Sequence, residues 1–325
     1  MDTLAGFLAG PRARGAFVLQ SMLEPPFAIR VVDEAPLTVV SLVQGGAWVV
    51  PDAAPAERVR PGDVAIVRGP GHYTVADDPA TPIRIVIHPG QRCTTPDGES
   101  VSAAMALGVR TWGSDVAGSV VMLTGTYEGE GAVSRRLLDV LPDLVVLRRG
   151  AWASPVVPML AAEVSRDVPG QQVVLDRLLD LLLVEALRAW FDQPDAPAPA
   201  WYRAHADPVV GPALRMLQER PADPWTVASI AAEAGVSRAA LARRFNEVVG
   251  EPPMTFLAGW RMALAADLLL EPGASVTSVA RQVGYHSPFT FSTAFKRVVG
   301  VSPLEHRRRG TATAETSGPA PAASR

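Results

Sequence analysis

The chain has 325 residues, of which 48% are hydrophobic and 19% charged, so it is long enough for two domains with separate cores and is not disordered as a whole. Its single cysteine, Cys93, excludes an internal disulfide and a cysteine-rich zinc site. The net charge of −3 is uneven: residues 1–206 have 17 arginines against 23 acidic residues, whereas residues 207–309 have 12 basic against 9 acidic ones. An acidic first part and a mildly basic second part indicate two different roles.

The beginning of the chain does not read as a signal peptide, because its apolar run is short and an acidic residue stands at position 2. The longest apolar stretch, VVLDRLLDLLLVEALRAWF, contains five charged residues and is not a membrane span. We therefore expect a soluble, cytoplasmic protein without a membrane partner.

Residues 16–148 consist of short runs of β-branched residues, such as LTVVSLV and IRIVIHPG, separated by Gly, Pro and Asp. Runs of this length with turn residues between them are typical of an antiparallel barrel or sandwich. From about residue 154 the hydrophobic pattern becomes helical. The expected fold class is therefore α+β, with an N-terminal antiparallel β-barrel followed by helices.

The helix expected over residues 171–191 is apolar over most of its circumference. Its apolar side chains form two stripes, Leu175, Leu178 and Leu182 on one side and Val174 and Leu181 on another. One face of a barrel cannot cover both stripes, so the pattern predicts a homodimer joined through this helix. Complete burial within one subunit is the alternative.

Two segments of the second part are copies of one pattern: TVASIAAEAGVSRAALARRFNEVVG (226–250) and SVTSVARQVGYHSPFTFSTAFKRVVG (275–300). Matching residues lie 49 apart before the turn and 50 apart after it, because His286 is inserted in the second copy. A repeat of this length indicates one supersecondary unit present twice.

Each copy is predicted to be a helix, a glycine-containing turn and a second helix, which is a helix-turn-helix. Thr226 and Ser275 are the expected N-caps of the first helices, and Ser237 and Ser287 those of the second. Pro288 stands at the first helical position, where its fixed φ suits a helix.

The second helix of each copy is expected to be held by buried apolar residues, namely Leu241, Phe245 and Val248, and Phe291, Phe295 and Val298. The segment between the copies, 252–271, is predicted to be one long helix. It would act as a rigid spacer that places the two second helices in successive major grooves, about 34 Å apart.

Residues 208–309 resemble the DNA-binding domain of the AraC/XylS family of transcription regulators. The matching residues are Gly284, Tyr285, Phe295, Lys296, Gly300, Ser302, Pro303 and Arg307. The resemblance implies an all-α domain of two helix-turn-helix units joined by a long helix, which binds double-stranded DNA in a sequence-specific manner. It also implies contact with RNA polymerase if the protein is an activator.

By this resemblance the base-facing residues are Ala239, Ala242 and Arg243 in the first recognition helix and Phe289, Thr290 and Thr293 in the second. The remaining expected DNA-binding residues are Ser237 and Ser287 at the helix starts, and Arg238, Lys296 and Arg297 for phosphates.

Arg243 is the one base-facing side chain able to bind guanine in a bidentate manner, and Phe289 and Thr290 suit thymine methyl groups. Arg244 projects from another side, where a structural role and a DNA contact are equally open. Against the DNA contacts of Arg243 and Arg297 stands the alternative that they are merely solvated. Few basic side chains imply a shallow salt dependence, so a dimer would help tight binding.

Residues 16–200 are similar to the cupin-type sensor domains attached to many such regulators, through the motif VRPGDVAIVRGPGHYTV (59–75). This implies that a small organic effector binds inside the barrel, and Trp48, His72 and Tyr73 are the candidate pocket residues. Residues 1–15 and the loop around Cys93 would close over it. A core role for Trp48 and a turn role for His72 are the alternatives.

A metal site is not expected, because residues 1–71 contain no histidine and the first cupin motif, with its paired histidines and glutamate, has no counterpart. No other cofactor is expected. Cys93 is either a redox-sensing thiol or an inert one, and the lack of a second cysteine favours the inert thiol.

Two other functions compete with a regulator. A cupin-type metal-dependent enzyme with a helical appendage would lack its metal ligands, and a DNA-repair protein of this type would need several cysteines. We therefore expect a regulator and not an enzyme. Its expected parts are a sensing and dimerisation domain (1–192), a linker (193–207), a DNA-binding domain (208–309) and a disordered tail (310–325).

Overall fold

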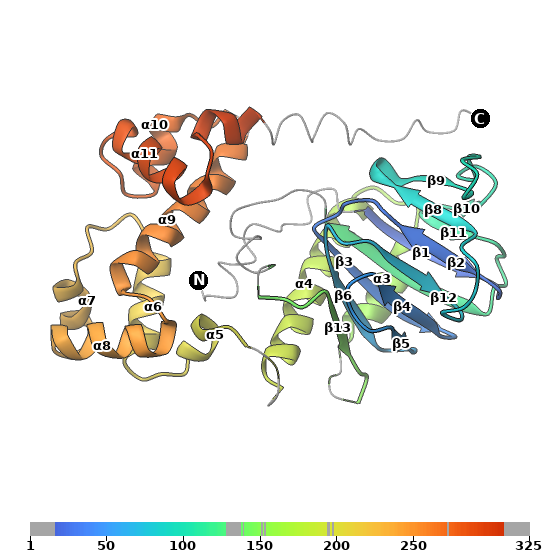
Figure 1. Cartoon of the computed structure of the whole chain (residues 1–325), viewed down its shortest axis with the longest axis horizontal. Coiled ribbons are helices and arrows are strands. Elements are labelled where there is room, and N and C mark those ends of the chain that lie inside the picture. Colours follow the sequence, from blue (N-terminus) through green and yellow to red (C-terminus); the bar gives the residue numbers. More distant parts are fainter. Residues whose placement is uncertain are drawn as a thin grey trace. The chain divides into compact units, whose positions relative to one another are not determined.

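The computed structural model describes residues 17–308, except 128–137, 139, 151, 153, 194, 195, 197 and 272. The expected N-terminal arm and the tail from 310 onwards lie outside the described residues. The described chain divides into two compact units, one before and one after about residue 196. Figure 1 shows strands and helices in the first unit and helices in the second, which confirms the α+β class.

Two β-sheets make up most of the first unit. The strands are β1 (Phe17–Leu23), β2 (Ala28–Val31), β3 (Leu37–Gln44), β4 (Ala47–Pro51), β5 (Glu57–Val59), β6 (Val64–Arg68), β7 (Tyr73–Ala76), β8 (Ile85–His88), β9 (Arg92–Thr94), β10 (Ala106–Gly108), β11 (Thr111–Gly113), β12 (Val120–Tyr127) and β13 (Leu144–Leu147). One sheet has the order β10-β11-β1-β12-β3-β6-β13, and the other has the order β5-β4-β7-β2-β8-β9.

The predicted closed antiparallel barrel is corrected in two respects. The described strands form two separate sheets, and two strand pairs, β1 with β11 and β2 with β8, are parallel. Alternation of apolar residues tells which side chains point inward, but it does not tell which strands are neighbours. The sandwich, which was the other form allowed by the pattern, is the one observed.

The core of the first unit lies between the two sheets. Val40 and Leu42 of one sheet and Val49 and Val75 of the other belong to the same cluster of buried residues. Alternate residues of each strand therefore point into one apolar interior, as expected for stacked sheets.

Two helices, α3 (Val156–Val164) and α4 (Gln171–Phe191), pack on each other and on the strands. Gly125 of β12 allows α4 to approach closely, because a Cβ at this position would lie 2.3 Å from Leu179 Cδ1. The hydroxyl of Tyr127 donates to the carbonyl oxygen of Leu179 at 3.0 Å. The described residues include no helix with the length and apolar character needed to cross a membrane.

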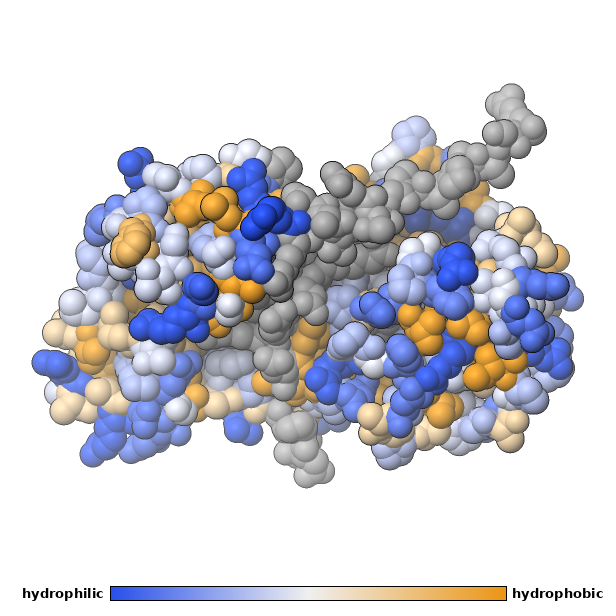
Figure 2. Space-filling model, turned by 45° about the horizontal axis from the view of Figure 1, so that its top comes forward, coloured by the Kyte–Doolittle hydropathy of each residue, from blue (hydrophilic) through white to orange (hydrophobic). Residues whose placement is uncertain are grey.

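The second unit is built from α5 (Ala200–Ala204), α6 (Val210–Glu219), α7 (Val227–Glu233), α8 (Arg238–Val249), α9 (Pro253–Leu270), α10 (Val276–Gln282) and α11 (Pro288–Val299). The pairs α7–α8 and α10–α11 are the two predicted helix-turn-helix units, and α9 is the predicted long helix between them. Hydrophilic side chains cover much of this unit's visible face (Figure 2).

All four predicted N-caps are present. Thr226 and Ser275 each accept the N–H of the third helical residue, and those residues are serines whose hydroxyls accept the cap N–H in return. Ser237 and Ser287 accept the N–H groups of Ala240 and Thr290. Each cap satisfies a backbone donor that a helix start leaves open.

The predicted buried residues of the second helices are confirmed, except for Val298. Leu241, Phe245, Phe291 and Phe295 are fully buried, and Val248 is partly buried against the first core. Val298 is 49% exposed. The next residue, Val299, packs against the core in its place, because it lies two four-residue steps after Phe291 on the same face.

Candidate nucleic-acid interface

The two recognition helices start in the same way. A serine cap precedes each helix, and the next two residues, Arg238 and Ala239 in α8 and Pro288 and Phe289 in α11, are exposed. The first turn of a helix is the part that a helix-turn-helix inserts among base edges. Both units therefore present their first turns to the surface, as a reading surface requires.

Arg243 extends from α8 with 77% of its side chain exposed. Its Nε lies 3.7 Å from a carboxylate oxygen of Glu247, one turn further along. An exposed pair at this distance is weak. The guanidinium is thus accessible to an incoming base, and Ala239 and Ala242 beside it leave room for close approach.

Arg244 has a structural partner, which supports the structural one of the two roles that the sequence left open. Its Nη2 lies 2.8 Å from Oδ2 of Asp207, whose side chain is only 6% exposed. Asp207 Oδ1 also accepts the N–H groups of Val209 and Val210 at the start of α6. Burial works against the charged form, but these hydrogen bonds and Arg244 together lower the pKa of Asp207.

The start of α11 is less polar than that of α8. Phe289 is 82% exposed, and Thr290 and Thr293 are exposed next to it. The hydroxyl of Thr293 donates to the carbonyl oxygen of Phe289 at 3.1 Å, which turns this hydroxyl back onto its own helix. The arrangement favours apolar contact with base edges, such as thymine methyl groups, over a dense set of hydrogen bonds.

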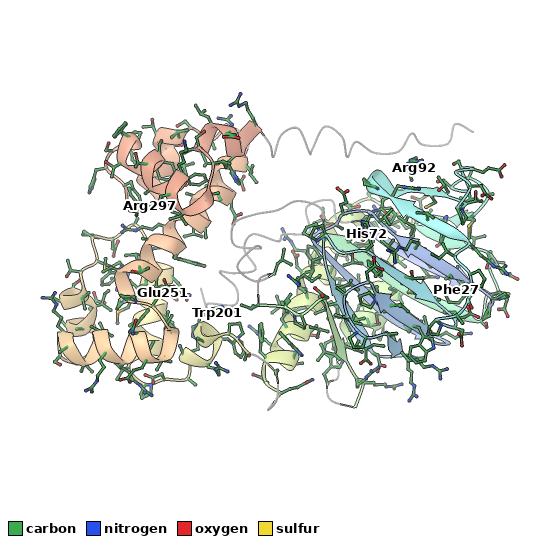
Figure 3. All side chains as sticks on the ribbon, in the orientation of Figure 1. Phe27, His72, Arg92, Trp201, Glu251 and Arg297 are labelled. Carbon is green, nitrogen blue, oxygen red and sulfur yellow. The ribbon has the colours of Figure 1, made fainter. Side chains whose placement is uncertain are left out.

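Lys296 and Arg297 lie further along α11, and both are exposed; Arg297 is labelled in Figure 3. Their position after the first turns suits phosphates better than base edges. The predicted DNA-binding residues are therefore all at or near the surface of α8 and α11, with Ala242 and Ser287 half-buried. The pairing of Arg244 with Asp207 was not found from the sequence, because the two residues are far apart in the chain.

The three candidate pocket residues of the first unit are not brought together. Tyr73 is buried in the core between the sheets, and burial raises its pKa. Trp48 is only half-buried and alternates with Ala47 and Val49, which point into that core. His72 is exposed just before β7 (Figure 3).

Trp112 of β11 is a core residue that the sequence did not single out. It is 7% exposed and belongs to the same cluster as Tyr73. Its indole Nε1 is buried without a hydrogen-bond acceptor among the described residues. No motif marks this position, because a tryptophan in a short strand looks like ordinary core material.

Cys93 lies in this cluster too and is 9% exposed. Burial raises the pKa of its thiol, and Sγ donates to the carbonyl oxygen of Gln91 at 3.5 Å. A raised pKa keeps the group as the less nucleophilic thiol. Within the described chain no three His, Cys, Asp or Glu side chains are grouped as a metal site.

Comparison with known families gives two matches. Residues 2–192 match a family described as Cupin, and residues 230–309 match one described as Helix-turn-helix domain. The first match covers more than half of the chain. Together they confirm the two resemblances seen in the sequence motifs.

The relatives are transcription regulators. A Streptomyces lividans protein described as an AraC-like transcription regulator is 31% identical over 255 residues, which cover 77% of this chain and 79% of the relative. A Streptomyces antibioticus protein of the same description is 33% identical over 65% of this chain and 71% of its own length. The HTH-type transcriptional regulator AlkR of Acinetobacter baylyi is 32% identical over 53% of this chain and 58% of its own length.

A solved structure of the DNA-binding domain of AdpA, a global transcriptional factor, in complex with a target DNA is 32% identical to this chain. The match covers 33% of this chain and 96% of the solved domain, with a TM-score of 0.31. Two matched domains and relatives similar over most of their length agree with the doubled helix-turn-helix. This chain therefore belongs to the AraC-like transcription regulators, with a cupin domain followed by a helix-turn-helix domain that binds DNA.

Proposed function

We propose that this regulator reads DNA with α8 and α11 in neighbouring major grooves, and that a small effector and a second copy of the chain bind its first unit. The observation that carries the DNA part is the doubled helix-turn-helix, whose two recognition helices both start with a serine cap and an exposed first turn. The domain limits 1–192 and 208–309 are part of this proposal.

Within the interface, Arg243 would provide the base contact with the greatest discrimination. Two of its guanidinium N–H groups can donate to the O6 and N7 acceptors of guanine. Phe289 and Thr290 would contact thymine methyl groups, and Ala239, Ala242 and Thr293 would face the remaining base edges. The phosphate contacts would come from Arg238, Lys296 and Arg297 and from the helix starts at Ser237 and Ser287.

The direct experiment is to select binding sites for the full-length protein from a pool of random duplexes. The expected site has two short conserved blocks about 10 base pairs apart, one for each recognition helix. Enrichment of no sequence at low salt, or of a single block, would contradict the proposal.

For the effector we propose a small organic molecule inside the sandwich, held by the indole N–H of Trp112. A buried donor without an acceptor costs free energy, so an acceptor on a ligand would stabilise the occupied form. The apolar residues around Trp112, together with Tyr73 and Cys93, suit a ligand that is mostly apolar with one polar group. No redox role for Cys93 is part of this proposal.

For the dimer we propose the exposed side of α4. Leu175, Leu178 and Leu182 are buried within the subunit, so only the other stripe is available. That stripe consists of Val174 and Leu181, which are 43% and 45% exposed, and the adjacent Val173 is 62% exposed. Met159 of the adjacent α3 is 51% exposed and would extend it. Aliphatic residues grouped on one helix face are typical of a protein–protein contact.

We propose no enzymatic activity, because the relatives are described as transcription regulators. A regulator of this kind acts where the chromosome lies, so we propose a cytoplasmic location. Contact with RNA polymerase belongs to the proposal only for the case of activation.

A further inference from the structure

The two helix-turn-helix units have separate hydrophobic cores. Leu241, Phe245 and Trp260 belong to the first core, whereas Met262 and Phe291 belong to the second. Helix α9 contributes to both, and its residue 261 lies between Trp260 of one core and Met262 of the other. Helix α9 therefore joins the two helix-turn-helix units, and contacts beside it add to how firmly they are held relative to each other.

A direct contact between the units occurs at the second turn. Gly284, in the turn between α10 and α11, has φ +82°, and a Cβ at this position would lie 2.7 Å from the carbonyl oxygen of Ala222. Ala222 belongs to the loop 220–225, which leads into α7 of the first unit. The turn of the second helix-turn-helix unit therefore lies against the backbone of the first helix-turn-helix unit.

Arg261 of α9 holds this contact. Its Nε donates to the carbonyl oxygen of Pro221 at 2.6 Å, and its Nη2 donates to that of Asp223 at 2.8 Å. Its guanidinium carbon lies 5.9 Å from the ring centroid of Tyr285, the residue after Gly284. We name Arg261, Gly284, Tyr285 and the loop 220–225 the junction.

Both sides of the junction are tied to helices of the units. In the loop, Arg220 lies over the ring of Trp225 at 4.6 Å and pairs with Glu233 of α7 at 2.6 Å. On the other side, the ring of Tyr285 packs edge-on against Phe291 of α11, with 5.8 Å between centroids. A continuous set of contacts thus runs from α7 through Arg261 to the second recognition helix.

We propose that Arg261 is a positioning residue, which fixes α8 and α11 relative to each other and so sets the number of base pairs required between their two contact blocks. The inference rests on the proposed DNA reading by both helices. One added base pair turns the second block by about 35° around the duplex, since a turn takes 10–10.5 base pairs. With a rigid junction, α11 cannot follow that rotation and DNA affinity falls. With a loosened junction, α11 can follow it and affinity is kept.

The test measures affinity of the full-length protein for its selected site and for derivatives with one or two base pairs inserted or deleted between the blocks. The affinity of the wild-type protein is expected to fall at least tenfold for each inserted base pair. Arg261→Met, which removes the donors, is expected to bind the best site several-fold more weakly than the wild type. Its affinity is expected to fall less than threefold for each inserted base pair. Arg261→Lys, which keeps the charge but not the paired donors, is expected to lie between them.

Arg215→Met on α6 is the matched control, because Arg215 is exposed and the same side-chain change removes the same charge. It is expected to keep the wild-type spacing profile. Uniform weakening of Arg261→Met at every spacing, or no change, would overturn the inference.

If Arg261→Met loses its helical circular dichroism, Arg261→Lys and Gly284→Ala must show the flattened profile instead, and a wild-type profile in both would overturn the inference. Failure of the wild-type protein to enrich any site would count against the proposed function and is seen before any variant is made.

Discussion

Arg244 and Asp207 lie 37 residues apart in the sequence, and the Nε and Nη2 of the arginine are 2.9 and 2.8 Å from the same carboxylate oxygen. The other oxygen of Asp207 caps the start of α6. One carboxylate therefore connects α6 to the first recognition helix, and Arg244 is used in building the domain. Its neighbour Arg243, whose side chain is 77% exposed, is the arginine of this helix that we propose for a base contact.

We expect Asp207→Asn to lower the thermal unfolding midpoint of the full-length protein at pH 7. The lowered pKa of Asp207 means that the folded state favours the carboxylate. Its contribution to stability is present above the unfolded pKa of about 3.9 and is lost as the pH falls through the lower folded pKa. The gap between variant and wild type should therefore close in acid. A gap that stays constant between pH 7 and pH 3 would show that the charge is not responsible.

Arg243→Ala is expected to cost about 1–3 kcal/mol on the best site and to relax the preference at one base position. Lys296→Ala is expected to weaken all sequences similarly and to reduce the salt slope by about one unit. Titrations of both variants on the selected and on a scrambled duplex at several salt concentrations distinguish these outcomes. Equal losses of Arg243→Ala on both duplexes would assign Arg243 to the DNA backbone.

Glu247→Gln is expected to raise DNA affinity by about twofold to fivefold at low salt. Glu247 pairs with both Arg243, at 3.7 Å, and Arg244, at 3.5 Å, and it places a negative charge on the recognition helix. The comparison is with Glu219→Gln on α6, which removes the same charge away from α8. An equal gain of DNA affinity in both variants would show that only the net charge of the protein matters.

Trp112→Phe is expected to leave the ligand-free protein as stable as the wild type or slightly more stable, because it removes a buried donor without an acceptor. An effector found by a thermal-shift screen of metabolites should bind this variant about threefold to tenfold more weakly, which corresponds to one neutral hydrogen bond. Trp48→Phe is the control and should leave that affinity intact. Unchanged binding by Trp112→Phe would place the effector elsewhere.

Leu181→Asp is expected to convert a dimer into a monomer in light scattering at micromolar concentration, because it puts a charge into the exposed apolar side of α4. Ile83→Asp provides the matched control, since Ile83 is 43% exposed and Leu181 is 45% exposed. A wild-type monomer, or a dimer that survives Leu181→Asp, would disprove this contact.

Local features were predictable from the sequence because they depend on neighbouring residues. The caps Ser237 and Ser287 and the proline at 288 follow from the chemistry of a helix start, and the doubled pattern revealed both units. Contacts between distant residues were not predictable, because spacing along the chain does not encode them. The pairing of Arg244 with Asp207 belongs to this group, as does the separation of the strands into two sheets. The placement of the candidate pocket residues was not predictable for the same reason: Tyr73 points into the core, whereas the neighbouring candidate His72 is exposed.

The close fit of Gly125 under Leu179 has a consequence for the outside of the molecule. An added methyl group at 125 would collide with Leu179 and push α4 away from β12, straining the bond from Tyr127 to the same residue. The opposite side of α4 carries Val173, Val174 and Leu181. A single carbon atom added deep inside the first unit would therefore displace an exposed apolar helix face, and with it the dimer contact that we propose for this face.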